Sequence, residues 1–116
     1  MLTYYGYAKC GTCRKAQKAL AAAEISSEDH DITIDPPPRR LLERALASGY
    51  TIGDLFNTSG VQYRELKMKD KVKSLPESEL LDLLAGNGRL IKRPIVTDGE
   101  RVTIGYKAEI FDETWC

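Results

Sequence analysis

Residues 2–23 read LTYYGYAKCGTCRKAQKALAAA, and the prediction of the fold begins with them. Its first four residues are mostly apolar, carry two tyrosines and a β-branched threonine, and stop at Gly6, which predicts a strand. After Cys10 the apolar residues recur with the i, i+3, i+4, i+7 spacing of an amphipathic helix. Those positions are Ala16, Ala19, Leu20 and Ala23.

A second strand is predicted over Asp31–Asp35, with Ile32 and Ile34 on one face. Strand, helix and strand within about 35 residues make a βαβ unit, which favours parallel pairing of its strands. Pro36-Pro-Pro38 ends the unit, because proline cannot donate to a strand ladder.

The chain from Pro36 to Gly88 is predicted to be helical. The first expected helix carries Leu41, Leu42, Ala45 and Leu46 and ends at Gly49, and a helical turn over Thr51–Phe56 follows it. The last expected helix begins at a capping box, Ser74-Leu-Pro-Glu77, and ends at Gly86. Its apolar residues are Leu80, Leu81, Leu83 and Leu84.

Extended structure returns near the end of the chain. Pro94–Thr97 and Arg101–Ile104 flank a tight turn at Asp98-Gly99 and predict a hairpin. Lys107–Trp115 then predicts a final helix over the sheet. The residues expected in the core here and in the first strand are Tyr4, Tyr5, Ile110, Phe111 and Trp115.

Composition limits the classes of function. The chain has 116 residues, 17 basic and 17 acidic side chains and a formal net charge of zero, so we expect one domain that binds neither nucleic acid nor a membrane surface directly. No apolar run approaches the roughly 20 residues of a membrane span, and the first residues do not resemble a secretory signal. Three cysteines are too few for a secreted disulfide scaffold, and we expect a reducing cytosol.

Cys10-Gly-Thr-Cys13 is the candidate reactive site, because it lies where a strand gives way to a helix. Unpaired N–H groups of a first helical turn stabilise a thiolate and lower the pKa of a cysteine there. Lys9 and Arg14 add positive charge. Cys13, one turn further in, is predicted to be more buried and placed to attack a mixed disulfide on Cys10.

Two other interpretations of the cysteine pair remain. Zinc needs four ligands, and only His30 and Cys116, without supporting spacing, could complete a set, so we expect no metal. The pair could also be inert core cysteines. His30 is expected on the surface at a strand edge, and Cys116 in an exposed tail or, as a further hypothesis, folded back as a third redox thiol.

Arg93-Pro94 opens the predicted third strand, where proline is tolerated only at an end or an edge. It is either an edge-strand proline or a cis bend at Pro94 that packs opposite the cysteine loop and exposes backbone for binding an incoming peptide or thiol substrate.

Four motifs together resemble the arsenate reductase/Spx-like family, and the resemblance covers essentially the whole chain. They are Tyr4–Ala16 with its Cys-x-x-Cys, Leu55–Gly60 with Tyr63–Leu66, Leu90–Val96 and Val102–Tyr106. The resemblance implies an α/β, thioredoxin-like mixed sheet (βαβ…ββα) within one domain over 1–116, with its core at 1–35 and 89–116, a helical insertion at 36–88, and a cis Pro94 beside the reactive cysteine.

The resemblance further implies a cytoplasmic thiol–disulfide redox protein with Cys10 as nucleophile. Our first expectation is a glutathione-coupled reductase in which Cys13 resolves the mixed disulfide. Thr12 would offer a hydrogen bond to the sulfur, Arg93 would steer an anionic thiol, and Asn57 would contact the substrate, although Asn57 also fits a simple turn residue. No bound cofactor is expected; glutathione would act as a co-substrate.

Two other functions occur within the same family. Arsenate reductases linked to glutaredoxin surround the oxyanion with three arginines, but two of those positions are Asn57 and Tyr106 here, which lack the bidentate guanidinium fork of arginine. Spx-like regulators use Cys-x-x-Cys as a redox switch and bind RNA polymerase. For that function the lysine-rich run Arg64–Lys73 would be a docking face, although such a run also fits a solvated helix face.

Overall fold

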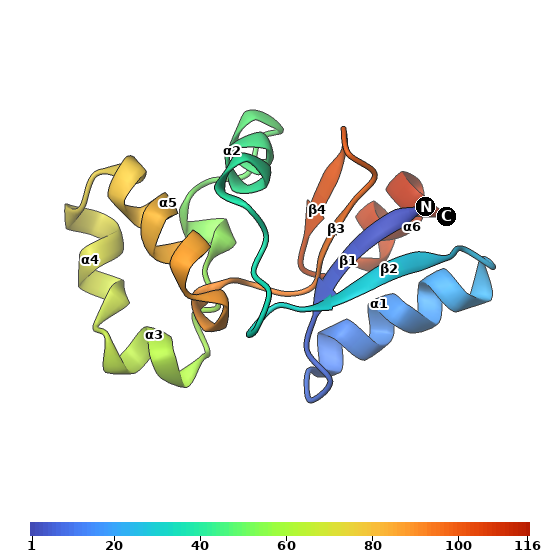
Figure 1. The fold of residues 1–116 in the computed structure, drawn as a ribbon, viewed down its shortest axis with the longest axis horizontal. Coiled ribbons are helices and arrows are strands. Elements are labelled where there is room, and N and C mark those ends of the chain that lie inside the picture. The colour runs from blue at the N-terminus through green and yellow to red at the C-terminus, as the bar shows by residue number, and fades with distance from the viewer.

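The computed structural model describes all residues from 1 to 116, and a four-stranded mixed sheet lies at its centre (Figure 1). The strand order is β2-β1-β3-β4. Strand β1 (Leu2–Gly6) pairs in parallel with β2 (Ser27–Asp31) and antiparallel with β3 (Ile95–Thr97), which in turn pairs antiparallel with β4 (Val102–Ile104). The predicted parallel βαβ unit and the C-terminal hairpin are therefore confirmed.

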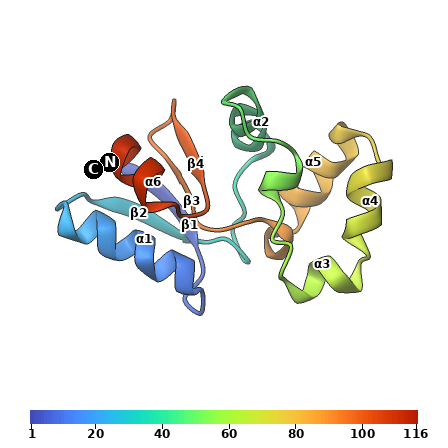
Figure 2. The same cartoon turned by 180° about the vertical axis from the view of Figure 1, so that it is seen from behind.

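Six α-helices and two short 3₁₀ turns complete the fold: α1 (Gly11–Ala22), α2 (Arg39–Ala47), η1 (Gly53–Leu55), α3 (Val61–Glu65), α4 (Met68–Ser74), α5 (Glu77–Gly86), η2 (Gly88–Leu90) and α6 (Ala108–Trp115). Helices α1 and α6 lie together along the sheet, whereas α2–α5 gather at its other side (Figures 1 and 2). This βαβ, helical block and ββα order is the predicted thioredoxin-like architecture.

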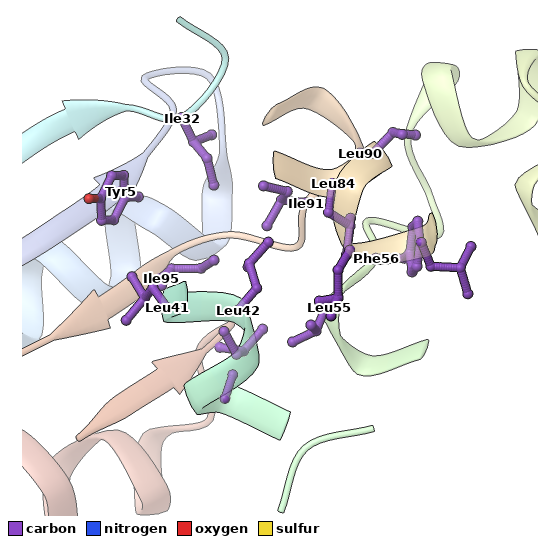
Figure 3. Packing of buried hydrophobic residues seen from close by; sticks show 14 of the residues in the cluster. Tyr5, Ile32, Leu41, Leu42, Leu55, Phe56, Leu84, Leu90, Ile91 and Ile95 are labelled. Atoms are coloured by element: carbon purple, nitrogen blue, oxygen red, sulfur yellow. The ribbon is translucent and has the colours of Figure 1, made fainter. Parts of the chain in front are cut away.

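Alternate side chains along the strands pack in two separate hydrophobic cores, because successive strand residues point to opposite faces of a sheet. Tyr4 and Val96 face α1 and α6, whereas Tyr5 and Ile95 face the helical block. The smaller core contains Tyr4, Cys13, Ala16, Leu20, Val96, Phe111 and Trp115. The larger core, part of which is drawn in Figure 3, contains Tyr5, Ile32, Leu41, Leu42, Ala45, Leu55, Phe56, Met68, Leu80, Leu81, Leu84, Leu90, Ile91, Ile95, Val102 and Ile104.

A short antiparallel contact joins the helical block to the sheet. Phe56 and Ile91 form an isolated bridge. On either side of it, the Asn57 N–H donates to the Leu90 carbonyl at 2.8 Å and the Lys92 N–H donates to the Leu55 carbonyl at 2.8 Å. Because residue 95 already belongs to β3, this contact places the 55–57 segment directly beside the entrance to the sheet.

The second strand was predicted over Asp31–Asp35, and this prediction is wrong because the strand lies earlier in the chain. Strand β2 is the polar segment Ser27–Asp31, paired residue for residue with β1. It ends where β1 ends, and the Asp31 carboxylate then accepts the Thr33 N–H at 2.9 Å, which turns the chain. Ile32 is fully buried but Ile34 is 81% exposed, so the two do not share a face. Apolar alternation failed here because an edge strand is paired by its backbone, whatever its side chains.

Two smaller predictions are also wrong. The Ser74 hydroxyl donates to the Asp70 carbonyl within α4, so no capping box opens α5, which begins after Pro76. Ile110 is 47% exposed, because the buried face of the short α6 is defined by Phe111 and Trp115 instead.

The lysine-rich run is not one helix. It spans the end of α3 and most of α4, with Lys67 in the left-handed conformation (φ +53°) between them, and its lysines are exposed. None of the helices is long and apolar enough to cross a bilayer.

Candidate active site

Cys10 is the N-cap residue of α1, with an extended backbone (φ −105°, ψ 119°). Its Sγ accepts a hydrogen bond from the Cys13 N–H at 3.3 Å and lies 3.7 Å from the Thr12 hydroxyl oxygen. The sulfur thus takes the place that a serine or aspartate oxygen takes in a common helix cap, where it meets the unpaired donors of the first turn. The predicted position of Cys10 at a helix N-terminus is confirmed.

The surroundings of Cys10 favour its thiolate. Partial burial works against ionisation, but hydrogen bonds from Cys13, Thr12 and the Arg93 guanidinium outweigh it and hold the pKa of Cys10 below the ordinary thiol value. Arg93 is itself held in place by the Tyr7 ring, 5.2 Å from the guanidinium carbon. Cys10 is therefore a half-exposed thiol that ionises readily, which is what a nucleophile requires.

Cys13 has the opposite environment. Its side chain is 1% exposed and packs in the smaller core beside Tyr4 and Val96. Burial is the main reason that the pKa of Cys13 rises to about 11, and its hydrogen bond to Cys10 adds to the rise. Both thiols are free in this structure. The pair consists of a half-exposed thiol with a lowered pKa and a buried thiol with a raised pKa one turn behind it, as the sequence predicted.

A cleft of about 500 Å³ opens in front of Cys10. It is lined by Cys10, Thr12, Phe56, Asn57, Thr58, Ser59, Gly60, Val61, Lys92, Arg93, Ile104, Tyr106 and Lys107. Four predicted site residues from three distant parts of the chain thus meet in one place. Cys13 and Pro94 do not line the cleft, since both are buried behind it.

Positive charge dominates this cleft. Lys92, Arg93 and Lys107 line it, and no lining residue carries a carboxylate. The stem of Lys92 lies over Gly105, which has φ +75° and no side chain in the way. Such a site attracts anions and disfavours cationic ligands.

Lys92 and Lys107 were not predicted from the sequence. Each adjoins a motif residue that was singled out, Arg93 or Tyr106, but charge at one sequence position does not reveal which of the many exposed lysines faces the cleft. Only the pairing of β3 with β4 brings the two ends of the hairpin together there.

Asn57 organises a turn and also lines the cleft, and its contact with a substrate stays a prediction. Its carbonyl accepts the Gly60 N–H at 3.1 Å, and its side-chain oxygen accepts the Ser59 hydroxyl at 3.4 Å, so it organises the turn. The same side chain is half-buried and lines the cleft. A side chain on Gly60 would press against the Asn57 amide, so this turn fits closely around it.

The Arg93–Pro94 peptide bond is cis, as the resemblance implied. Pro94 is buried, and its carbonyl accepts the Gly105 N–H at 2.8 Å, which joins the start of β3 to the end of β4.

His30 and Cys116 lie away from the cleft. His30 stacks on Tyr5 at 5.0 Å and its Nδ1 lies 2.6 Å from an Asp35 carboxylate oxygen, so it is half-buried rather than freely exposed. Cys116 is exposed at the end of α6, with its sulfur 3.8 Å from the Ala19 carbonyl.

A thioredoxin-like sheet, a capping cysteine with a second cysteine three residues later, and a cis-proline define the class of the protein as a thiol redox fold. The ArsC family profile matches residues 5–114, nearly the whole chain. The protein belongs to the ArsC family.

Relatives within this family carry different descriptions. The chain is 50% identical to the "Uncharacterized protein YusI" of Bacillus subtilis, over 98% of both chains. It is 31% identical to the "Global transcriptional regulator Spx" of Streptococcus pyogenes, over 94% of this chain and 81% of that one. Its fold matches the structure of "a possible arsenate reductase" from Streptococcus mutans with a TM-score of 0.87 and 40% identity, over 97% and 98% of the two chains.

Proposed function

We propose that the protein is a small thiol–disulfide reductase of the reducing cytosol that uses glutathione as its co-substrate. The observation that carries this proposal is the contrast between the two cysteines: Cys10 is half-exposed in a basic cleft and favours the thiolate, whereas Cys13 is buried directly behind it. If the two cysteines were inert core residues, we would expect both sulfur atoms to be buried, and not one of them to line a cleft.

The reaction has two exchange steps. The Cys10 thiolate attacks one sulfur of a bound disulfide, a Cys10–substrate disulfide forms, and the other half leaves as a thiolate. Cys13 then loses its proton to solvent and attacks the Cys10 sulfur. This step expels the bound thiol and leaves a Cys10–Cys13 disulfide. Two molecules of glutathione return the pair to the dithiol and become oxidised glutathione.

Attack at Cys10 also eases the second step. The Cys10 thiolate raises the pKa of Cys13 by its charge, and that charge disappears once Cys10 is in a mixed disulfide. Burial still disfavours the Cys13 anion, so the resolving step becomes easier without becoming free.

Glutathione suits the cleft because it is a small peptide thiol with net negative charge. A cleft of about 500 Å³ lies in the range of roughly 300–1,000 Å³ that holds small ligands. Arg93 would attract a carboxylate of glutathione close to the reacting sulfur, and Thr12 and Asn57, which also line the cleft, would supply polar contacts.

Oxidised glutathione tests the proposal directly. Reduced protein is mixed with it, quenched with acid at intervals and weighed by mass spectrometry. We expect wild type to gain glutathione briefly and end as an internal disulfide. Cys10→Ser should capture nothing at this site, and Cys13→Ser should accumulate a stable glutathione adduct.

Cys116→Ser is the matched control, since it removes an exposed thiol outside the cleft and should follow the wild-type time course. Capture that persists in Cys10→Ser and vanishes in Cys116→Ser would sink the proposal.

A redox-sensing regulator is the second candidate. Similarity to a relative described as Spx favours it, together with the exposed lysines at the start of α4 and along it, which could meet an acidic protein surface. In that case the Cys10–Cys13 disulfide would alter binding to RNA polymerase instead of turning over a substrate. Copurification with RNA polymerase that depends on the oxidation state would favour the regulator over the enzyme.

Arsenate reduction is the third candidate, favoured by the match to the structure from Streptococcus mutans. Arg93 and two lysines line the cleft, but Asn57 and Tyr106 stand where arginines would hold the oxyanion. Consumption of arsenate in the presence of glutathione and glutaredoxin would support this activity.

A further inference from the structure

The buried hydroxyl of Tyr4 lies beside Cys13, and this hydroxyl has no part in the two exchange steps described above. The residue lies in the middle of β1, is 3% exposed and belongs to the smaller core together with Cys13. Its hydroxyl donates a hydrogen bond to the Cys13 carbonyl at 3.2 Å. A polar group in an apolar core therefore points at the residue proposed to resolve the mixed disulfide.

Gly6 makes this placement feasible. A Cβ atom at position 6 would overlap the ring and hydroxyl of Tyr4, so the tyrosine lies directly across the glycine to reach the start of α1. The contact thus depends on two residues of β1, Tyr4 and Gly6. A phenylalanine would fill the same core equally well, but it would have no group to offer Cys13.

The Tyr4 hydroxyl donates to the Cys13 carbonyl in this structure, and a phenolic O–H can rotate toward another acceptor close by. Burial raises the pKa of the Cys13 thiol, and the neighbouring Tyr4 hydroxyl works against that rise by favouring the thiolate. Burial, above all, raises the pKa of Tyr4 well beyond its usual value, so the phenol keeps its proton. It can donate a hydrogen bond to a sulfur anion but cannot act as a base.

We propose that Tyr4 donates a hydrogen bond to the Cys13 thiolate as Cys13 attacks the mixed disulfide, and so sets the rate of the resolving step. The inference rests on the proposed function. As the Cys13 proton leaves to solvent, the Tyr4 hydroxyl turns from the carbonyl to the sulfur. The Cys13–Cys10 bond then forms, the bond from Cys10 to glutathione breaks, and the glutathione thiolate carries away the electron pair.

Tyr4→Phe tests this with the acid-quench experiment, since it removes one oxygen and keeps the ring. A hydrogen bond to a charged group is strong enough that its loss should slow decay of the glutathione adduct about tenfold or more. The pH profile of that decay should move to higher pH. Capture of glutathione by Cys10, measured in the same time course, should stay within twofold of wild type.

Tyr5→Phe is the matched control. It deletes the same atom from the next residue, which faces the other core, and both steps should remain as in wild type. Gly6→Ala is a second variant, which should slow adduct decay by displacing the Tyr4 ring.

Adduct decay in Tyr4→Phe that matches wild type in rate and pH profile overturns the inference, as does an equal slowing of capture and decay. Loss of capture in wild type itself would instead count against the proposed reductase, so the two failures are distinguishable.

Discussion

At the scale of single residues, the Cys10 sulfur lies at the open end of α1 and the Cys13 sulfur lies one turn inside the core. The same side chain thus has a lowered pKa in one place and a raised pKa in the other. Hydrogen-bond donors outweigh burial at Cys10, whereas burial prevails at Cys13. This difference supports the proposed roles of Cys10 in attack and Cys13 in resolution.

The pH dependence of Cys10 reactivity follows from this. A thiol reacts as its anion, so a lowered pKa means that alkylation by neutral iodoacetamide rises at a lower pH than for free cysteine. Arg93→Gln removes one donor to the anion and should move that profile toward higher pH. The rate is measured in a Cys116→Ser background, so that Cys10 is the accessible thiol.

Arg89→Gln provides the comparison, because Arg89 is an exposed arginine of η2 that does not line the cleft. It should leave the profile unchanged. If both variants shift the profile equally, Arg93 acts through general charge and not through contact with Cys10.

At the scale of elements, close backbone approaches fix the positions of the segments around the cleft. η2 passes so near the end of the first βαβ unit that a Cβ atom at Gly88 would overlap the Ile32 carbonyl. A glycine is required there by lack of space, not by a left-handed backbone. The approach aligns residues 90–92 with residues 55–57, and so places Asn57 near Arg93.

Gly88→Ala should therefore destabilise the protein by roughly 1–3 kcal/mol, the range found for overpacked cores, or by more if the backbone cannot shift. Gly86→Ala is its control, two residues earlier at the end of α5, where a Cβ atom meets nothing within 4 Å. Because alanine favours helices, that change should be neutral or stabilising by up to about 1 kcal/mol. Urea unfolding measures the stability of the two variants. An equal loss of free energy of unfolding in both would contradict the importance of the close contact between Gly88 and Ile32.

At the scale of the whole molecule, the sheet is shared between two cores on opposite faces. The larger core takes residues from the sheet and from the helical block alike, as Figure 3 shows for Tyr5 and Ile95 opposite Leu42 and Leu84. This continuity predicts that helices and sheet unfold together as one domain.

Leu84→Ala tests that coupling. Leu84 is fully buried in the larger core, and its truncation should cost about 2–5 kcal/mol. Trp115, the single tryptophan, lies in the smaller core across the sheet. Its fluorescence and the helical circular dichroism should show the same lowered midpoint in urea.

Leu83→Ala is the control on the same helix. Because the Leu83 side chain is 38% exposed, its truncation should lower the free energy of unfolding much less than that of Leu84. A Trp115 midpoint that stays at the wild-type value while the helical signal moves would show that the helical block unfolds on its own.

The order of elements, the helix that starts at Cys10 and the burial of Cys13 behind it could be predicted before the fold was known, because they depend on local patterns: apolar spacing, a glycine boundary and a cysteine pair one turn apart. The C-terminal hairpin could be predicted for the same reason. The position of β2 could not, because the polar segment Ser27–Asp31 gains its strand structure from pairing with β1.

The set of side chains that share the cleft depends on how distant segments pack in the folded chain. Asn57, Arg93 and Lys107 are far apart in the chain, and they meet because the Phe56–Ile91 bridge and the β3–β4 pairing join their segments. The contact of Tyr4 with Cys13 likewise requires β1 to pass under the start of α1. Contacts of this kind join residues that are distant in the sequence, so no local sequence pattern predicts them.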